Sequence, residues 1–321
     1  MLDVNAFEMP ERGCGPLRGL YPFTAMMNAS CSPNTQNSID GSWLCTVRAV
    51  RAIGKGEEIT DTYTSTMANT LYRRRQLKAQ KYFDCSCARC SDPTELGSHF
   101  STLLCRAAGC TGFVLCGDPL DYTSAWACLK CGQKVEGEEV RREQEEWEEK
   151  VEAAPRELAV QESLLAELRQ LYHPGHNLCC DVLFNLVPLY GSSRGRQEHP
   201  EAIDLVAEAE RKEAACTQLL DTMALAVPGQ FRVRGMMLVE LHSTRTFLLR
   251  SHLESGQSSK SQFVRRLAGL RPQLLEALEV LGREPEGSLE ASRREQALGY
   301  LSQLEGVVGT AGKTLLAADK E

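Results

Sequence analysis

The chain has 321 residues, a formal net charge of −7 and a hydrophobic fraction of 42%. This mild acidity gives no electrostatic case for nucleic-acid binding, and no apolar run is long enough to span a bilayer. We therefore expect a chain that buries an ordinary core and binds neither nucleic acid directly nor a membrane.

The 14 cysteines fall in short-spaced sets rather than spreading evenly along the chain. Residues 1–5 are too polar for the apolar region of a secretory signal peptide. Cysteines grouped in this way indicate metal sites in a reducing compartment rather than disulfides. We expect the cytoplasm, the nucleus or both.

Residues 1–82 are predicted to form a β-rich region that closes with a helix. Strand-forming residues predict a strand over 43–50, and the glycines at 54 and 56 predict a turn. A second strand is predicted over 57–63, ending in Tyr63. A helix is expected over 68–81. Its basic residues are placed on a solvated face: Arg73, Arg74, Arg75, Lys78 and Lys81.

After a cysteine-rich segment at 83–135, residues 136–321 are predicted to be helical. Apolar spacing predicts one helix over 136–152, ended by Pro155, and a second over 158–171. His173 and His176 are interpreted as part of a turn rather than as metal ligands. Further helices are expected at 178–189, 201–226, 233–253, 262–281 and 288–316.

The first candidate metal site begins with Cys85, Cys87 and Cys90, which form a C-x-C-x2-C run. Zinc takes four ligands in a tetrahedron, so the trio needs a distant partner, and Cys31 is the natural candidate. Four cysteines leave no position for water, so the site would be structural. The alternative is that one or more of them are plain buried thiols.

The second candidate metal site pairs a C-x4-C run with a C-x2-C run, as in a zinc ribbon. Its ligands are Cys105, Cys110, Cys128 and Cys131. Gly109 and Gly132 beside them suit tight turns. Cys116 leaves an alternative open, since it could replace one ligand or be a free thiol.

Three motifs in a fixed order carry a family resemblance: residues 28–34 (NASCSPN), 56–63 (GEEITDTY) and 83–90 (FDCSCARC). Together they resemble the C-terminal half of a SET domain with its post-SET cysteines. Residues 5–7 and 19–22 resemble the SET-and-MYND (SMYD) branch in particular, in its arthropod-type form. One departure is Ala29, which stands where the family has His. The resemblance also predicts that the MYND module and the first half of the SET domain are missing from this sequence.

The resemblance implies an α+β fold with three regions. These are the C-terminal half of a SET domain (1–82), a post-SET and zinc-ribbon segment (83–135) and a TPR-like helical domain (136–321). The helix-pair period alone is not clean enough to establish a TPR-like stack.

The resemblance also implies S-adenosylmethionine as cofactor beside the two zinc ions. Asn5 and Asn28 would contact the cofactor, Ala29 through its main chain, and Phe83 would stack on the adenine. Tyr63 would place its hydroxyl near the transferred methyl group and is the candidate catalytic residue. Tyr82 or Tyr21 could line a channel for the substrate lysine. Without the motif, we would interpret Asn28 as a residue that satisfies backbone groups at the end of a strand, and Tyr63 as an ordinary packed aromatic ring.

Two classes of function follow from these readings. The first is a protein-lysine methyltransferase that acts on a histone or another protein carrying a target lysine. The second is a non-catalytic scaffold, stabilised by zinc, whose helical domain binds partners in transcriptional regulation on chromatin. The predicted absence of the first half of the SET domain, which would bind part of the cofactor, favours the scaffold, as does Ala29 in place of His. Tyr63 and the order of the motifs favour the enzyme.

Overall fold

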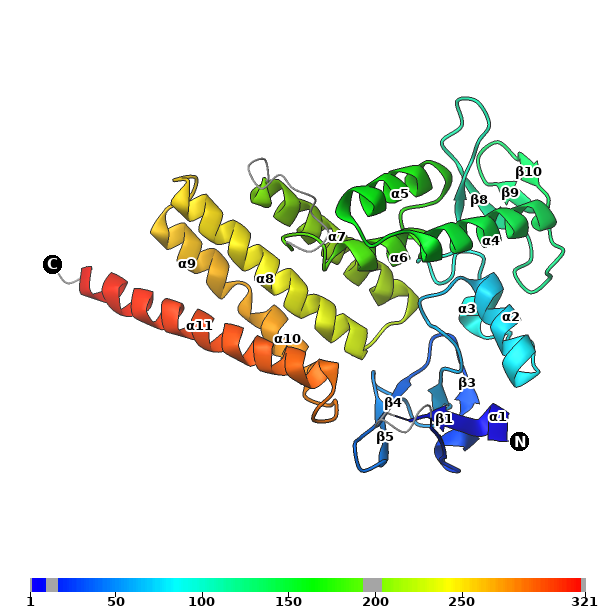
Figure 1. Cartoon of the computed structure of the whole chain (residues 1–321), viewed down its shortest axis with the longest axis horizontal. Coiled ribbons are helices and arrows are strands. Elements are labelled where there is room, and N and C mark those ends of the chain that lie inside the picture. Colours follow the sequence, from blue (N-terminus) through cyan, green and yellow to red (C-terminus); the bar gives the residue numbers. More distant parts are fainter. Residues whose placement is uncertain (1, 10–16, 193–203, 319–321) are drawn as a thin grey trace. The chain divides into compact units, whose positions relative to one another are not determined.

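The structure is a computed structural model that describes residues 2–9, 17–192 and 204–318 (Figure 1). Its described residues form two compact units. The first holds residues 2–9, 17–189 and 221–229, and the second holds 190–192, 204–220 and 230–318. The fold mixes helix and sheet as predicted, with small sheets and cysteine-rich loops followed along the sequence by a helical region.

The first part of the first unit consists of short strands that pair two at a time. After the short helix α1 (Leu2–Asn5), β1 (Ala6–Glu8) pairs antiparallel with β2 (Arg18–Leu20). The short 3-10 helix η1 (Thr24–Met26) leads to β3 (Asn28–Ala29), which pairs in parallel with β6 (Thr60–Asp61). The remaining pair is the antiparallel β4 (Thr35–Ile39) and β5 (Cys45–Ala49).

The strand predicted over 57–63 is shorter in the structure, because a side chain takes over part of its pairing. Asn34 accepts a hydrogen bond from the Thr60 backbone N–H at 2.8 Å and donates one to the Glu58 carbonyl at 2.8 Å. Glu57 instead accepts from the Gly54 N–H at 2.9 Å, which closes the preceding turn. Only Thr60 and Asp61 remain to pair as a strand.

Helix α2 (Thr70–Lys81) follows, and the predicted solvated basic face is confirmed for Arg75 and Lys78, which are exposed, but not for Arg73 and Arg74. Asn69 caps its first turn by accepting from the Tyr72 N–H at 2.8 Å, and Tyr82, at φ 61°, ends it. Arg73 and Arg74 are buried, with exposures of 0% and 4%. The prediction fails for these two residues because both guanidinium groups find partners inside the protein, as a charged group must when it leaves water.

The cysteine-rich segment contains one short helix and one small sheet. Helix α3 (Ala88–Ser91) begins within the cysteine run. An antiparallel four-stranded sheet follows, in the order β10-β9-β8-β7. Its strands are β7 (Leu103–Leu104), β8 (Phe113–Cys116), β9 (Trp126–Cys128) and β10 (Lys134–Val135).

Three helices complete this part of the first unit and match the predicted positions closely. They are α4 (Gly137–Ala153), α5 (Leu158–Leu171) and α6 (Asn177–Leu186). Helix α6 packs against both α4 and α5, which Figure 1 shows in green. His176 is fully buried and caps α6 by accepting from the Leu178 N–H at 3.3 Å, in agreement with its interpretation as part of a turn.

The later helices are α7 (Leu205–Ala226), α8 (Arg232–Glu254), α9 (Lys260–Ala268), α10 (Arg271–Leu281) and α11 (Leu289–Ala318). Residues 201–203 of the helix predicted over 201–226 lie outside the described residues. The single helix predicted over 262–281 is two helices, because Gly269 and Leu270 separate α9 from α10. Pro272 falls in the first turn of α10, where its missing N–H costs nothing.

Helices α8, α10 and α11 pack on one another in the second unit, as Figure 1 shows in yellow to red. Gly235 of α8 lies against α10. A Cβ added there would lie 2.9 Å from the Val280 side chain and 3.0 Å from that of Leu281. The glycine therefore sets how closely these two helices approach.

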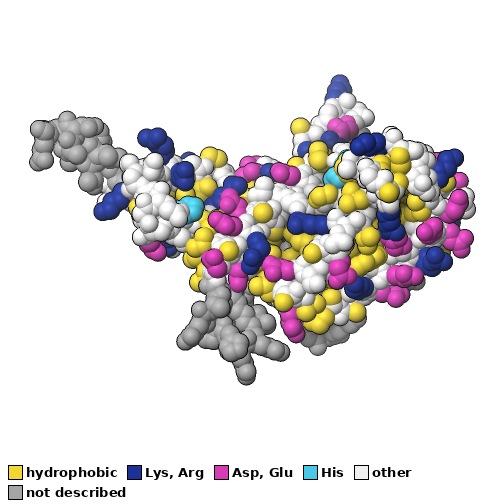
Figure 2. All heavy atoms as spheres, turned by 90° about the horizontal axis from the view of Figure 1, so that it is seen from above, with side chains coloured by type: hydrophobic (Ala, Val, Ile, Leu, Met, Phe, Trp, Pro, Cys, Tyr) yellow, Lys and Arg dark blue, Asp and Glu magenta, His cyan; other side chains and the backbone are white. Residues whose placement is uncertain are grey.

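The visible surface in Figure 2 carries acidic and basic side chains interspersed with each other. Among the described residues, no helix combines the length and apolarity that a membrane crossing requires.

Candidate functional site

The structure brings the four cysteines of the first predicted metal site together. The sulfur atoms of Cys31, Cys85, Cys87 and Cys90 all lie within 4.8 Å of one another. Cys31 Sγ is 3.9 Å from Cys85 Sγ and 3.5 Å from Cys90 Sγ. Four thiolates about 2.3 Å from a tetrahedral zinc ion would lie roughly 3.8 Å apart, so the donor set fits this metal.

Hydrogen bonds among the four thiols lower the pKa of Cys31 and Cys87 and raise the pKa of Cys85 and Cys90. The pKa of the Cys31 thiol is lowered to about 7, first by its hydrogen bond with Cys85 and further by the positive charge of Arg73. Because zinc binds the deprotonated sulfur, this environment prepares Cys31 to be a ligand.

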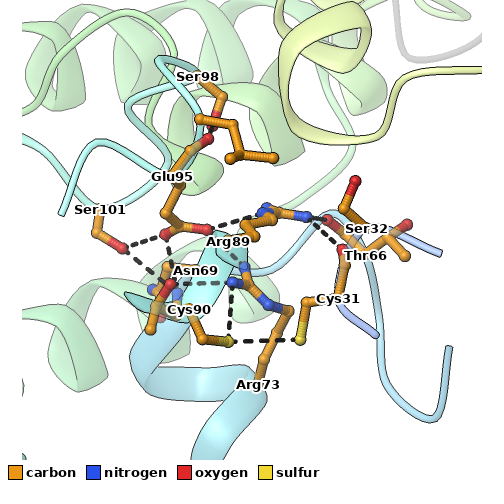
Figure 3. Close-up of polar contacts among 12 residues, drawn as sticks. Cys31, Ser32, Thr66, Asn69, Arg73, Arg89, Cys90, Glu95, Ser98 and Ser101 are labelled. Atoms are coloured by element: carbon orange, nitrogen blue, oxygen red, sulfur yellow. Dashed lines mark hydrogen bonds and ion pairs between the residues drawn. The ribbon is translucent and has the colours of Figure 1, made fainter. Parts of the chain in front are cut away.

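A buried carboxylate between two arginines supports the same cluster (Figure 3). Glu95 Oε2 lies 2.6 Å from Arg73 Nη1 and 3.0 Å from Arg89 Nε, and all three side chains are almost completely buried. Burial alone would raise the pKa of Glu95, but the two guanidinium groups outweigh it and hold the pKa at about 2. The carboxylate therefore stays charged at neutral pH.

The two arginines connect this carboxylate to the cysteine segments. Arg89 Nη1 donates to the carbonyl of Cys31 at 3.1 Å and to that of Thr66 at 2.6 Å. Arg73 Nη2 reaches Cys90 Sγ at 3.6 Å. The network thus fixes the backbone of Cys31 against helix α3, which lies more than fifty residues later in the sequence.

The second predicted metal site is also assembled. The sulfur atoms of its four cysteines lie within 4.8 Å of one another, and they come from Cys105, Cys110, Cys128 and Cys131. The pair Cys105–Cys131 is separated by 3.6 Å and the pair Cys110–Cys128 by 3.7 Å, distances that again fit tetrahedral zinc.

The glycines around this second cluster explain its compactness. A Cβ at Gly112 would lie 2.6 Å from Cys128 Sγ, so only glycine fits there. Gly109 and Gly132 have φ of 72° and 74°, which is the turn conformation that glycine adopts without strain. Cys116 lies in β8 outside this group, and burial raises the pKa of its thiol.

A cavity of about 740 Å³ lies beside the first cysteine cluster. Its volume falls within the range of small-molecule sites. Asn5 and Tyr63 both line it, together with Phe7, Lys81 and Tyr82.

Tyr63 links this cavity to the metal cluster. Its ring packs against the buried cysteines, and its hydroxyl donates to the carbonyl of Met27, the residue before Asn28. Burial raises the pKa of Tyr63, helped by the nearby Asp61 carboxylate. The hydroxyl is therefore neutral at physiological pH and sits next to a carbonyl oxygen.

The other predicted cofactor residues do not line the cavity. Asn28 donates to Glu58 Oε1 at 2.5 Å, and Ala29 pairs with Asp61 between β3 and β6. Phe83 packs with Tyr63 against the cysteine cluster. Tyr21 donates to the carbonyl of Trp43 at 2.7 Å, so of the two tyrosines proposed for a lysine channel only Tyr82 lines the cavity.

Comparison with known proteins agrees with this geometry. The family model described as "SET domain" matches residues 4–64, which include Cys31 and Tyr63. The chain is 44% identical over 134 residues to the SET domain-containing protein SmydA-8, isoform A, of Drosophila melanogaster, covering 41% of this chain and 29% of that protein. It is 36% identical over 129 residues to the histone-lysine N-methyltransferase ASHR1 of Arabidopsis thaliana (39% and 26%). It is 42% identical over 83 residues to the human histone-lysine N-methyltransferase SMYD3 (26% and 18%).

The chain is a SET-domain protein of the SMYD family. It spans less than a third of the length of each of these three relatives. Two of these three relatives are named as histone-lysine N-methyltransferases, and a SET methyltransferase uses S-adenosylmethionine. The two cysteine clusters are the groups in this SMYD chain that could hold zinc, among its described residues.

Sequence reasoning missed two features of this SMYD site. The first is the buried set of Arg73, Arg89 and Glu95, since a run of arginines on a helix usually marks a solvated face. The signal in the sequence that could have indicated this burial is the position of Arg89 inside the cysteine run. The second is Lys81, which the sequence predicts on the solvated face of the helix but which lines the cavity.

Proposed function

We propose that this chain carries the acceptor side of an S-adenosylmethionine-dependent protein-lysine methyltransferase, with Tyr63 as its catalytic residue. The observation that supports this most is the meeting of the Tyr63 hydroxyl and the Met27 carbonyl beside the cavity. The cofactor would supply a methyl group on a positively charged sulfur. The protein substrate would supply the lysine.

The two oxygen atoms suit such a reaction because methyl transfer is a direct displacement. The protein's main task is to align the amine with the methyl group rather than to form a covalent bond of its own. The phenol oxygen of Tyr63 and the carbonyl oxygen of Met27 both carry partial negative charge. They can therefore hold a positively polarised methyl group where the reaction occurs.

The remaining cofactor contacts are part of the same proposal. Asn5, at the cavity wall, and the Asn28–Ala29 backbone, one residue beyond the Met27 carbonyl, would hold the cofactor. Asn28 would exchange its present bond to Glu58 for a bond to the ligand. Phe83 would provide the apolar face for the adenine. The two zinc ions would be structural, since each cluster offers four cysteine sulfurs and no open position.

A lysine side chain must also lose its proton before it can attack. Free lysine has a pKa of about 10.4, so the site has to favour the neutral amine by removing it from water. The rings of Phe7, Tyr63 and Tyr82 at the cavity can contribute to this.

A scaffold that binds partners without catalysis is the second candidate. Two observations favour it: Asn28 is engaged by Glu58, and Ala29 offers no ring to the cofactor. In that case the zinc-stabilised segment and the helices would serve transcriptional regulators in the nucleus or cytoplasm.

Calorimetry with S-adenosylmethionine separates the two candidates. The enzyme predicts heat of binding for the unaltered chain and for Tyr63→Phe, and its loss in Asn28→Ala. Tyr63→Phe should then abolish methyl transfer to protein substrates, whereas Tyr72→Phe, at a partly exposed ring on α2, should not. Binding that Asn28→Ala leaves intact, or transfer that survives in Tyr63→Phe, would contradict the assignment.

A further inference from the structure

The two cysteine clusters differ in how open their sulfur atoms are to reagents in solution. In the first cluster three of the four cysteines are buried, and the fourth, Cys87, is partly exposed. In the second cluster Cys128 is buried, Cys105 and Cys110 are partly exposed, and Cys131 is exposed. The oxidation of a cysteine depends on its access to the oxidant as well as on its thiolate character, so the second cluster is the more open to oxidation.

Within the second cluster, Cys131 also differs from the other three cysteines in its hydrogen bonds. Backbone N–H groups donate to the sulfurs of Cys110 and Cys128, each at 3.4 Å, and the Ala107 N–H donates to that of Cys105. Among the described residues, no backbone N–H donates to the sulfur of Cys131. A donated N–H stabilises a thiolate and so weakens it as a nucleophile. Cys131 is therefore the most exposed sulfur and the one that no such bond weakens.

Cys105 is placed to react with Cys131 once the latter is oxidised. The two sulfur atoms lie 3.6 Å apart, between the segment that follows β7 and the turn that joins β9 to β10. The sulfurs of Cys110 and Cys128 lie at a similar separation of 3.7 Å. Exposure rather than distance therefore selects the pair that contains Cys131.

We propose that Cys131 is a site of oxidative modification, at which a peroxide opens the second metal site by joining Cys131 to Cys105 in a disulfide. The sulfur of Cys131 attacks one oxygen of hydrogen peroxide, the O–O bond breaks, and a sulfenic acid and a hydroxide ion form. The thiolate of Cys105 then attacks the sulfenic sulfur, which releases a second hydroxide. The two sulfurs lose two electrons, the peroxide gains them, and each hydroxide takes a proton from the buffer.

The disulfide removes two of the four sulfurs that would hold zinc, so the ion is released. The inference rests on the proposed zinc at this cluster and not on the proposed methyltransferase. Its effect reaches the neighbouring helices, because Arg106, directly after Cys105, forms an ion pair with Glu143 of α4. Tyr172, directly after α5, donates to the same carboxylate at 3.1 Å. Oxidation therefore acts beside a contact between the cysteine-rich segment and these helices.

Release of zinc from the unaltered chain tests the proposal. The zinc content of the purified chain is measured, hydrogen peroxide is added, and a zinc-binding dye follows the ion that is set free. One equivalent should leave at least ten-fold faster than the other, and a thiol reductant with added zinc should restore it. Release of both equivalents at the same rate would overturn the proposal.

Peptide mapping identifies the disulfide and needs no bound metal. Trypsin cleaves after lysine and arginine, so Cys105 falls in the peptide 90–106 and Cys131 in the peptide 131–134. Their disulfide joins two peptides, whereas the other pair of the cluster lies within the single peptide 107–130. A first disulfide inside 107–130 would contradict the proposal. The joined peptides in a chain purified without zinc would keep the modification site and remove the metal assignment.

Two variants separate the reactive sulfur from the rest of the cluster. Cys131→His keeps a zinc ligand but removes the nucleophile, so the faster equivalent should leave at least ten-fold more slowly than from the unaltered chain. Cys116→Ser, at a buried thiol outside both clusters, should release zinc like the unaltered chain. Equal release from Cys131→His and the unaltered chain would rule out Cys131 as the site. If Cys131→His fails to hold zinc, the peptide map of the unaltered chain decides.

Discussion

Arg89 donates a hydrogen bond to the carbonyl of Cys31 across 58 residues of sequence, with an N–O distance of 3.1 Å. The arginine lies inside the cysteine run, and the carbonyl belongs to the early segment that carries the fourth sulfur. The backbone of Cys31 is therefore held in place by protein contacts as well as by any bound metal.

Replacing Glu95 should destabilise the first unit strongly. Glu95→Gln leaves the guanidinium groups of Arg73 and Arg89 buried without a counter-charge, which costs about 3–5 kcal/mol. Urea unfolding followed by circular dichroism measures this loss. Glu145→Gln, at the exposed pair with Arg75, should cost less than about 1 kcal/mol. Equal effects of the two substitutions would show that the buried carboxylate has no special role.

Metal analysis should find about two zinc ions per purified chain, one for each cysteine cluster. Chelation should loosen the cysteine-rich segment, because the binding free energy of a structural zinc contributes directly to folding. Cys85→Ser should retain only the second ion, and Cys128→Ser only the first. Cys45 lies outside both clusters, so the Cys45→Ser variant should keep both ions. A metal-free chain with an unchanged melting curve would contradict the two zinc sites.

Asp181 should make stability fall as the pH rises. Burial raises its pKa to about 7, with a further contribution from the Glu148 carboxylate. The folded state therefore binds this proton more tightly than the unfolded chain, in which an aspartate has a pKa of about 3.9. Stability is highest below the unfolded value and declines as the pH rises from about 4 to about 7.

The Asp181→Asn variant checks this titration. Its stability relative to the unaltered chain should improve steadily between pH 5 and pH 7 in urea titrations. Asp84→Asn, at an exposed ion pair, should give a curve parallel to that of the unaltered chain over the same range. A constant offset for Asp181→Asn would mean that Asp181 does not titrate there.

Two glycine substitutions on helices of the second unit should act in opposite directions. Gly235→Ala forces a methyl group to within 2.9 Å of Val280 and should destabilise the chain by about 1–3 kcal/mol. Gly299→Ala meets open space in α11 and should stabilise it by about 0.5–1 kcal/mol. Thermal melting distinguishes the two, and a gain in stability from Gly235→Ala would show that α8 and α10 are not closely packed there.

Local patterns predicted the parts of the fold that depend on local physics. The predicted helix over 158–171 matches α5 residue for residue. Its leucines recur at helical spacing, and the residues that flank it in the sequence end the helix on both sides. Cysteine spacing likewise indicated both sulfur clusters, because zinc geometry limits how four ligands can be distributed along a chain.

Long-range partners explain what the sequence did not reveal. The burial of Arg73 depends on Glu95, 22 residues away, and no periodicity predicts that pairing. The shortening of β6 depends on the side chain of Asn34, which replaces a neighbouring strand.

The sulfur atoms of Cys31 and Cys90 lie 3.5 Å apart although 59 positions separate the two residues. During synthesis, Cys31 therefore cannot meet the other three cysteines of its cluster until the ribosome has released the cysteine run. Joining the ends of so long a loop has an entropic cost that slows folding. The rate at which the newly made chain matures should accordingly depend on the concentration of free zinc available at that moment.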